Sequence, residues 1–331
     1  MPAGAPVVHH VTSAPEARRK RTLVALASGV IRVRAALIVA VVTAFGASAI
    51  ADDTTVRDRI EMTPLMQAAR ADDAARVAAL LSAGADPRES VDVLDPTQGL
   101  SPGDTALSLA AEHAGTAVAC RLMEAGADVN AETYFHVTPL ARAAASNSAS
   151  MVALLLHAGA DAEAMDMKSR TPLMLAALRN DVAVAQRLLA LGADLHARDE
   201  AGRSTLMWAV GANSRAMAEM LVAAGDDLRH VTDRGETVLM AAAGSREVDS
   251  EVLGWLLAQG FDVNAIDARG KTALMAAAGW SRPEVVQMLL DHGADAASRT
   301  HDGQLAADFA AANPDIHRTN VYWRLNDARF E

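Results

Sequence analysis

A short pattern that returns about every 33 residues constrains the fold of this chain more than any other feature. Successive glycines that end apolar stretches lie 42, 33, 33, 33, 35 and 33 residues apart. In phase with them recur a hydroxyl residue, a leucine two positions later and an alanine five positions later. Such a pattern indicates a stack of similar units, each of which buries its apolar face against its neighbours. The glycines are Gly84, Gly126, Gly159, Gly192, Gly225, Gly260 and Gly293, and the hydroxyl residues are Thr63, Thr105, Thr138, Thr171, Ser204, Thr237 and Thr272.

The columns of the pattern predict two helices in each unit. A hydroxyl residue before proline, as in Thr138-Pro139, suits an N-cap followed by the first helical position. Apolar residues at helical spacing over 284–290 predict a second helix, for which Ser281 and Glu284 offer a capping box. The glycine then supplies a left-handed C-cap, and the aspartate two residues after it closes the chain reversal with an Asx turn.

Alanine and methionine are expected to fill the core, because only 3% of the residues are aromatic. The recurrent alanine, for example Ala176, falls where two helices approach so closely that a larger side chain would clash. In five units the recurrent leucine is followed by methionine, which we expect to be buried rather than to bind a soft metal ion. These methionines are Met66, Met174, Met207, Met240 and Met275.

The heptapeptide Thr171-Pro172-Leu173-Met174-Leu175-Ala176-Ala177, the period and Gly293-Ala294-Asp295 together resemble an ankyrin-repeat protein. The resemblance extends over about residues 58–325. It implies an all-α solenoid of helix-turn-helix pairs joined by β-hairpin fingers, with seven full repeats and an altered C-terminal capping repeat. Methionine stands where the family has a histidine after Thr-Pro-Leu, so the hydrogen bonds of that histidine are replaced or absent.

The N-terminal 51 residues read as a separate segment. Six basic residues lie within 18–34, an apolar run covers 35–45, and small residues precede Asp52. This order is typical of a secretory signal peptide cleaved after Ala51, which leaves residues 52–331 as the repeat domain. The protein would then be periplasmic, in a Gram-negative source, or secreted. Two alternatives stay open, an uncleaved leader that anchors the chain to the inner membrane and an organellar transit peptide. N-terminal sequencing of the mature protein separates a cleaved leader from an uncleaved one.

The net negative charge of the chain bears on which class of molecule it can bind. The whole chain carries 30 basic and 41 acidic residues, and loss of residues 1–51 would leave 24 against 40, a net charge of −16. Such a surface repels phosphate backbones and anionic lipids, so we expect neither a nucleic acid nor a lipid surface as partner. A protein partner with a basic patch is favoured instead.

Motifs that would indicate chemistry are absent from the sequence. It contains no HExxH, GxxxxGK[ST], GxSxG or CxxCH motif, and its histidines are scattered among different units. We therefore expect no catalytic residues, metal site or cofactor. Cys120, the single cysteine, is expected on the outer helices as an accessible but unreactive thiol. The alternative of an enzyme or metal carrier would require titratable groups that converge only in the folded chain.

A binding surface is predicted from columns that vary between units. The residues four and eight positions after the capping hydroxyl mix Arg, Gln, Trp and small side chains, which places them on the concave side of a solenoid. Aromatic and arginine side chains are the commonest binding hot spots. The alternative for the aromatics is structural: Trp208 and Trp280 would fill gaps between helices, and Tyr134 and Phe135 would pack one finger on the next. The predicted partner-binding residues are Tyr134, Phe135, Arg142, Arg170, Arg179, Arg198, Trp208, Arg229, His230 and Trp280.

Two insertions interrupt the period. Nine extra residues lie within 86–104 and two more lie between residues 243 and 253. We expect both in loops, as tolerated surface segments or as parts of a binding edge. The sequence thus predicts a non-catalytic scaffold or accessory module that binds another exported protein through its concave surface.

Overall fold

The computed structural model describes residues 62–92, 94–95, 99–112, 115–146 and 148–327, so the expected signal segment lies outside the described residues. The contacts within the chain divide it into two units. The smaller comprises Met1–Arg59 with Leu94–Leu100, and in its described part Asp95 and Leu100 form an isolated antiparallel bridge. The larger comprises Ile60–Val93 with Ser101–Glu331 and contains every helix discussed below.

The described residues contain sixteen helices, which form eight consecutive pairs. None of these helices combines the length and the apolar character that crossing a bilayer requires. The first helices of the pairs are α4 (Pro64–Arg70), α6 (Ala106–Glu112), α8 (Pro139–Ala145), α10 (Pro172–Arg179), α12 (Thr205–Gly211), α14 (Val238–Ala243), α16 (Ala273–Trp280) and α18 (Ala306–Ala312). The second helices are α5 (Ala74–Ser82), α7 (Thr116–Glu124), α9 (Ala149–His157), α11 (Val182–Ala190), α13 (Arg215–Ala223), α15 (Ser250–Ala258), α17 (Pro283–Asp291) and α19 (Asn320–Asp327).

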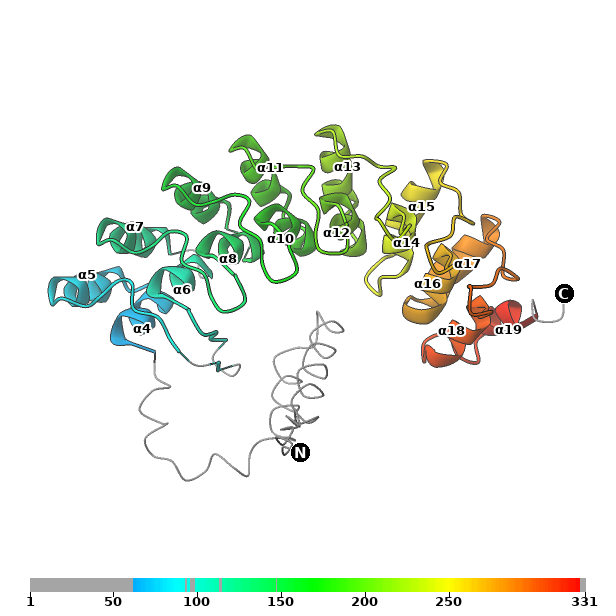
Figure 1. Cartoon of the computed structure of the whole chain (residues 1–331), viewed down its shortest axis with the longest axis horizontal. Coiled ribbons are helices and arrows are strands. Elements are labelled where there is room, and N and C mark those ends of the chain that lie inside the picture. Colours follow the sequence, from blue (N-terminus) through cyan, green and yellow to red (C-terminus); the bar gives the residue numbers. More distant parts are fainter. Residues whose placement is uncertain (1–61, 93, 96–98, 113–114, 147, 328–331) are drawn as a thin grey trace, which may run out of the picture. The chain divides into compact units, whose positions relative to one another are not determined.

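Within the larger unit, the helix pairs stack in sequence order. Each first helix packs on the next first helix and each second helix on the next second helix, so that two rows form (Figure 1). The first helices contact one another more extensively than the second helices do. The row of first helices is therefore the inner row of the stack. This arrangement confirms the predicted all-α solenoid of helix pairs.

The hydroxyl column starts the first helices as the sequence predicts. Each of the seven hydroxyl groups accepts the backbone N–H of the residue three positions later, for example Thr171 from Met174 at 3.4 Å and Ser204 from Met207 at 3.3 Å. In the eighth unit Leu305 occupies this position, and the carboxylate of Asp308 accepts the Leu305 N–H at 2.8 Å instead. Local side-chain bonds thus define the helix starts.

The glycine and aspartate columns are confirmed in every full unit. All seven glycines have φ between 70° and 105°, a region in which a side chain would be strained. Each following aspartate accepts the N–H two residues later at 2.8–2.9 Å, as an Asx turn requires. The aspartates are Asp86, Asp128, Asp161, Asp194, Asp227, Asp262 and Asp295.

The capping box predicted from Ser281 and Glu284 is wrong. Helix α17 begins at Pro283, its N-cap is Arg282, and no side chain caps it. Proline is favoured at the first helical position, so Pro283 sets the register and leaves Ser281 one residue too early to cap the helix. Ser281 is instead the C-cap of α16. Its carbonyl accepts a hydrogen bond from Asn313 Nδ2 at 2.9 Å.

The fingers between units are tight hairpins held by isolated backbone bonds. In the finger before α10, the Asp166 N–H donates to the Arg170 carbonyl at 3.1 Å, and before α16 the Asp267 N–H donates to the Lys271 carbonyl at 2.9 Å. Neighbouring fingers are joined by single bonds, such as Met167 N–H to the Phe135 carbonyl at 3.3 Å. Each finger therefore has a defined position relative to its neighbours.

The core is thin and lies between the rows. Each recurrent alanine, Ala176 among them, is at most 1% exposed, and the five column methionines are at most 5% exposed. Burial of both columns is thus confirmed. A helix–helix seam built from alanine leaves no room for longer side chains.

The described residues of both insertions fall in loops. The nine extra residues lengthen the finger before α6, whose base is closed by the Val91 N–H donating to the Asp104 carbonyl at 3.0 Å. The two extra residues lie between α14 and α15, where Ser245 Oγ donates to the Gly211 carbonyl at 2.5 Å. In the same loop Arg246 pairs with Asp315 of the last helix pair at 3.0 Å. The second insertion is thus tied both to the α12 unit and to the C-terminal unit.

Asp249 caps helix α15 and links it to the previous unit. Its Oδ1 accepts the N–H groups of Glu251 at 2.9 Å and Val252 at 3.1 Å, and it exchanges two 3.0 Å hydrogen bonds with Asn213. The hydrogen bond from Asn213 is the largest influence on the pKa of Asp249. Together with the backbone donors and Arg282 it outweighs burial and lowers that pKa below 3.8.

Replacement of Asp249 by alanine is expected to lower the free energy of unfolding by about 1–2 kcal/mol at pH 7, because the cap is lost. Since the pKa of Asp249 is lower in the folded chain, its ionised form stabilises the fold above pH 3.8, and this stabilisation is lost as the pH falls through the folded pKa. Urea unfolding at several pH values should show the two proteins converging below pH 3.8. Asp233→Ala, at an exposed fingertip, is the control and should change stability little. A pH-independent difference for Asp249→Ala would contradict an ionised cap.

Candidate functional site

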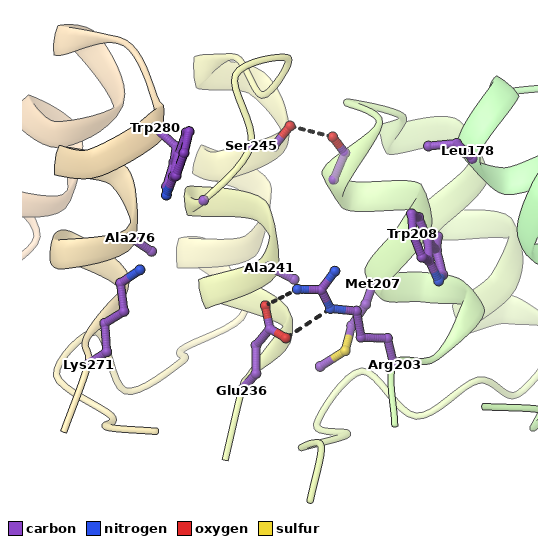
Figure 2. Close-up of a pocket in the computed structure, with 12 residues that line it drawn as sticks. Leu178, Arg203, Met207, Trp208, Glu236, Ala241, Ser245, Lys271, Ala276 and Trp280 are labelled. Carbon is purple, nitrogen blue, oxygen red and sulfur yellow. Dashed lines mark hydrogen bonds and ion pairs between the residues drawn. The ribbon is translucent and has the colours of Figure 1, made fainter. Parts of the chain in front are cut away.

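A groove opens on the row of first helices, from α10 to α16. Its volume is about 340 Å³, within the range of ligand-binding clefts. Figure 2 shows the groove with the two tryptophans at its opposite ends. The lining residues are Leu178, Arg203, Met207, Trp208, Gly211, Glu236, Ala241, Gly244, Ser245, Lys271, Ala276 and Trp280.

The hollow arises from a change of side-chain size between neighbouring units. Four residues after the cap, the α12 unit has Trp208, whereas the next two units have Ala241 and Ala276. Gly244 also lines the groove, and a Cβ built there would lie 3.6 Å from Ala276 Cβ, so the glycine leaves the space beside Ala276 open. Trp280, eight residues after its cap, closes the other end. The two variable columns predicted to face a partner therefore do meet in one groove.

Three charged residues form one edge of the groove, each directly before the capping residue of its unit. Arg203 binds Glu236 through two hydrogen bonds of 2.9 and 3.0 Å. Burial lowers the pKa of Arg203, but the hydrogen bond and charge of Glu236 and the charge of Asp199 raise it more, so the net pKa is raised. The third residue, Lys271, has its pKa lowered by burial, which outweighs the opposing charges of Asp267 and Glu236.

Lys271 differs from Arg203 in having no anionic partner. Among the described residues, no carboxylate lies within 4 Å of its Nζ, and this atom donates no hydrogen bond. The ammonium group lies instead 5.2 Å from the centre of the Phe309 ring. A cation–π contact of this kind is weaker than an ion pair with a carboxylate when the group is shielded from water.

The two tryptophans have different surroundings. Trp208 is half-buried, and its Nε1 donates to Asp199 at 3.1 Å. The guanidinium groups of Arg170 and Arg203 lie 5.6 and 6.0 Å from its ring. Trp280 is 61% exposed. Trp208 is thus held by contacts within the molecule, whereas the alternative that Trp280 fills a gap between helices is wrong.

Tyr134 and Phe135 lie at the tip of the finger before α8 and do not line the groove. They are 69% and 37% exposed, and their rings meet edge to face at 5.4 Å. The Phe135 carbonyl accepts the hydrogen bond from the next finger, and of the two rings Tyr134 is the more exposed to solvent. Their role in binding stays a prediction.

Two of the predicted arginines, Arg142 and Arg170, are engaged in ion pairs with low exposure. The Arg142 side chain is 12% exposed and contacts Asp104 at 2.6 Å and Glu112 at 2.5 Å. The Arg170 side chain is 15% exposed and contacts Asp166 at 2.5 Å. Both arginines therefore act within the fold.

The remaining predicted residues are dispersed. Arg179 is exposed at the end of α10, and Arg198 is half-buried, with a 2.9 Å hydrogen bond to the carbonyl of Ala197. His230 lies with its Nε2 2.7 Å from the Gly202 carbonyl of the previous finger. None of the three lines the groove.

Arg229, one of the predicted partner-binding residues, contacts the next unit of the fold. Its guanidinium donates to the carbonyls of Gln259 and Gly260, at the end of the next unit's second helix, and lies 4.4 Å from the Phe261 ring. Arg229 stands four residues after a helix-ending glycine, where side chains reach across to the next unit. Arg88, Asn130 and Asn264 occupy the same column and make equivalent bonds to Gly126, Gly159 and Gly293.

Sequence reasoning missed Arg203, Glu236 and Lys271. The signal was present, because the residue directly before the cap is charged in these three units. It also missed a column of threonine and aspartate five residues before the cap, whose side chains accept the N–H that closes each finger. This column comprises Thr133, Asp166, Asp199, Thr232, Asp267 and Thr300.

Two other kinds of chemical site were predicted to be absent, a metal site and a reactive thiol. In the part of the chain that the structure describes, no group of three or more His, Cys, Asp or Glu residues is placed to hold a metal ion. Cys120 is a half-buried free thiol on α7.

Comparisons with known proteins agree with the helix-pair stack. A family model described as ankyrin repeats (3 copies) matches residues 116–199, 140–232 and 206–300, and an ankyrin-repeat model matches residues 61–92. Among solved structures, the crystal structure of the human ASB11 ankyrin repeat domain is similar, with a TM-score of 0.56 and 27% sequence identity. The match covers 68% of this chain and 98% of that chain. A comparison with curated proteins found no match.

Proposed function

Because this chain belongs to the ankyrin-repeat family, we propose that it is a non-catalytic module that binds a protein partner in the groove between Trp208 and Trp280. Ankyrin repeats generally mediate protein–protein interactions. A fold alone does not identify a function, so the proposal rests on the site. The observation that carries it is the 61% exposure of Trp280 beside an open hollow.

Tryptophan in this position suits a binding hot spot. Tryptophan is enriched among the few interface residues that contribute most of the binding energy, especially next to a concave surface. The chain has only four tryptophans, and two of them end the same groove. A partner segment placed over Ala241 would lie between the two rings.

We place the interaction outside the cytoplasm, with another exported protein that has a basic patch. The leader pattern in residues 1–51 and the net charge of −16 for residues 52–331 support this. Chaperoning, stabilising or inhibiting that partner are tasks for such a module. With an uncleaved leader, the same module would be a scaffold tethered to the inner membrane.

Replacement of Trp280 by alanine is expected to weaken binding of a captured exported partner by about 30-fold, the effect of one hot spot. A triple variant in which Trp208, Trp280 and Tyr134 are alanine should abolish capture. Stability of the single variant should stay within about 0.5 kcal/mol of the original, because the ring is exposed. The measurement is capture by the purified full chain, followed by titration of the captured partner.

The control is Trp323→Ala, which removes a ring that is 53% exposed on α19, outside the groove. Its binding should equal that of the original chain. Undiminished capture by the triple variant would place the binding surface elsewhere.

A further inference from the structure

We propose that the partner segment that enters the groove is an extended peptide in which a large apolar residue and an aspartate or glutamate stand two positions apart, and that this carboxylate binds Lys271. The inference rests on the proposed function, because it concerns the same groove. It specifies the chemistry of the segment by which the partner is recognised.

The charges around the groove are satisfied within the fold, with one exception. Glu236 neutralises Arg203 at 2.9 Å, and Asp166 neutralises Arg170 at 2.5 Å. Oδ1 of Asp267 accepts the backbone N–H groups of Arg269 and Lys271, each at 2.8 Å. Among the described charged residues that line the groove, only the Lys271 ammonium has neither an ion pair nor a hydrogen bond.

This ammonium group is already partly removed from water. Lys271 is half-buried, and burial lowers its pKa, so the charged form is less stable there than in solution. A carboxylate from a partner would compensate that loss with a charge-assisted hydrogen bond. The Phe309 ring, 5.2 Å from Nζ, supports the ammonium on one side.

The apolar part of the ligand follows from the shape of the hollow. Figure 2 shows Ala241 between the two tryptophans and Ala276 below Trp280, next to Lys271. A volume of about 340 Å³ is at the lower end for ligand clefts, so it admits a few side chains rather than a folded surface. In an extended peptide successive side chains point to opposite faces, so residues two positions apart share one face. One apolar residue can therefore lie over the alanines while the residue two positions away reaches Lys271.

An acidic anchor is compatible with a partner that has a basic patch. The net charge of −16 acts on the approach of the whole partner, whereas Lys271 recognises a single side chain at contact distance. A partner would need both a basic surface and an acidic side chain for Lys271, so proteins with basic residues alone would not bind in the groove.

The test begins with selection of peptides from a random displayed library on the purified full chain. The expected outcome is enrichment of peptides with Asp or Glu two positions from a large apolar residue. Lys271→Met should weaken an enriched peptide about 10- to 100-fold, the range for loss of a charge-assisted hydrogen bond. Lys168→Met makes the same charge change in another finger, outside the groove, and should leave affinity unchanged.

A change in the peptide separates a direct contact from a structural effect. Substituting the peptide acid by its amide, Glu by Gln, should reduce affinity for the original chain by a similar factor. The same change should have no effect on binding to the Lys271→Met variant. Circular dichroism and thermal unfolding of this variant confirm that it is folded.

Three results would overturn the inference. These are no enrichment, enrichment without a preference for acids, and equal sensitivity of both chains to the amide peptide. If Trp280→Ala weakens binding while Lys271→Met does not alter it, the groove remains the site and only the acidic anchor fails. If Trp280→Ala alters neither peptide binding nor partner capture, the proposed function fails as well.

Discussion

Replacement of Arg142 by methionine is expected to lower the free energy of unfolding by about 3–5 kcal/mol, because it leaves a buried carboxylate without its counter-ion. The Arg142 guanidinium contacts both oxygens of Asp104 at 2.6 and 2.8 Å, and the side chain of Asp104 is 0% exposed. The ion pair links the finger before α6 to helix α8, so its loss also weakens the contact between two units. Urea unfolding followed by circular dichroism measures the change.

A second substitution identifies the origin of that loss. Asp104→Asn added to Arg142→Met removes the uncompensated charge, so the double variant should be more stable than Arg142→Met alone. Arg215→Met is the control, because Arg215 pairs with Glu219 at 2.8 Å on an exposed face and should contribute far less. Equal losses for Arg142→Met and Arg215→Met would show that burial of Asp104 has no energetic consequence.

Replacement of Leu173 by alanine is expected to cost about 2–5 kcal/mol, through lost apolar burial and the cavity that remains. Leu173 is 0% exposed, and α10 packs between the neighbouring first helices α8 and α12. Because each unit of a solenoid is stabilised mainly by its neighbours, the transition should also broaden as the two halves unfold separately.

Denaturant unfolding at two wavelengths measures both the midpoint and the width of that transition. Leu191→Ala is the matched control, since Leu191 is 36% exposed at the end of α11 and should lose much less stability. A loss for Leu173→Ala no larger than that of Leu191→Ala would contradict a core shared between units.

Columns that depend on contacts within one unit could be predicted from the sequence. The Thr171 cap, the left-handed Gly192 and the Asx turn of Asp194 each involve residues a few positions apart. Burial of Ala176 and Met174 followed from the period alone, because the same place in every unit meets the same neighbours. Because the same residues recur in seven units, the caps, turns and buried positions could be identified from the sequence.

Features that depend on contacts between units could not be predicted. One prediction within a unit also failed, because Pro283, two residues after Ser281, starts the helix in a different register from the expected capping box. The contacts of Arg229 could not be predicted, because the carbonyls that it binds, those of Gln259 and Gly260, lie in the next unit. Trp208 and Trp280 were treated alike, although one is enclosed by its neighbours and the other is exposed.

Short-range chemistry along the chain was sufficient to establish a stack of capped helix pairs with an alanine-rich seam. Which side chains remain available on that stack depended on how neighbouring units align. Stacking brings Arg203, Glu236 and Lys271, which are 33 and 35 residues apart, to one edge of the groove. There Arg203 and Glu236 form an ion pair, whereas the Lys271 ammonium has no such partner among the described residues. The period specifies the position of a side chain. Whether that side chain still lacks a hydrogen-bond or ion-pair partner depends on groups that only packing brings within hydrogen-bond distance.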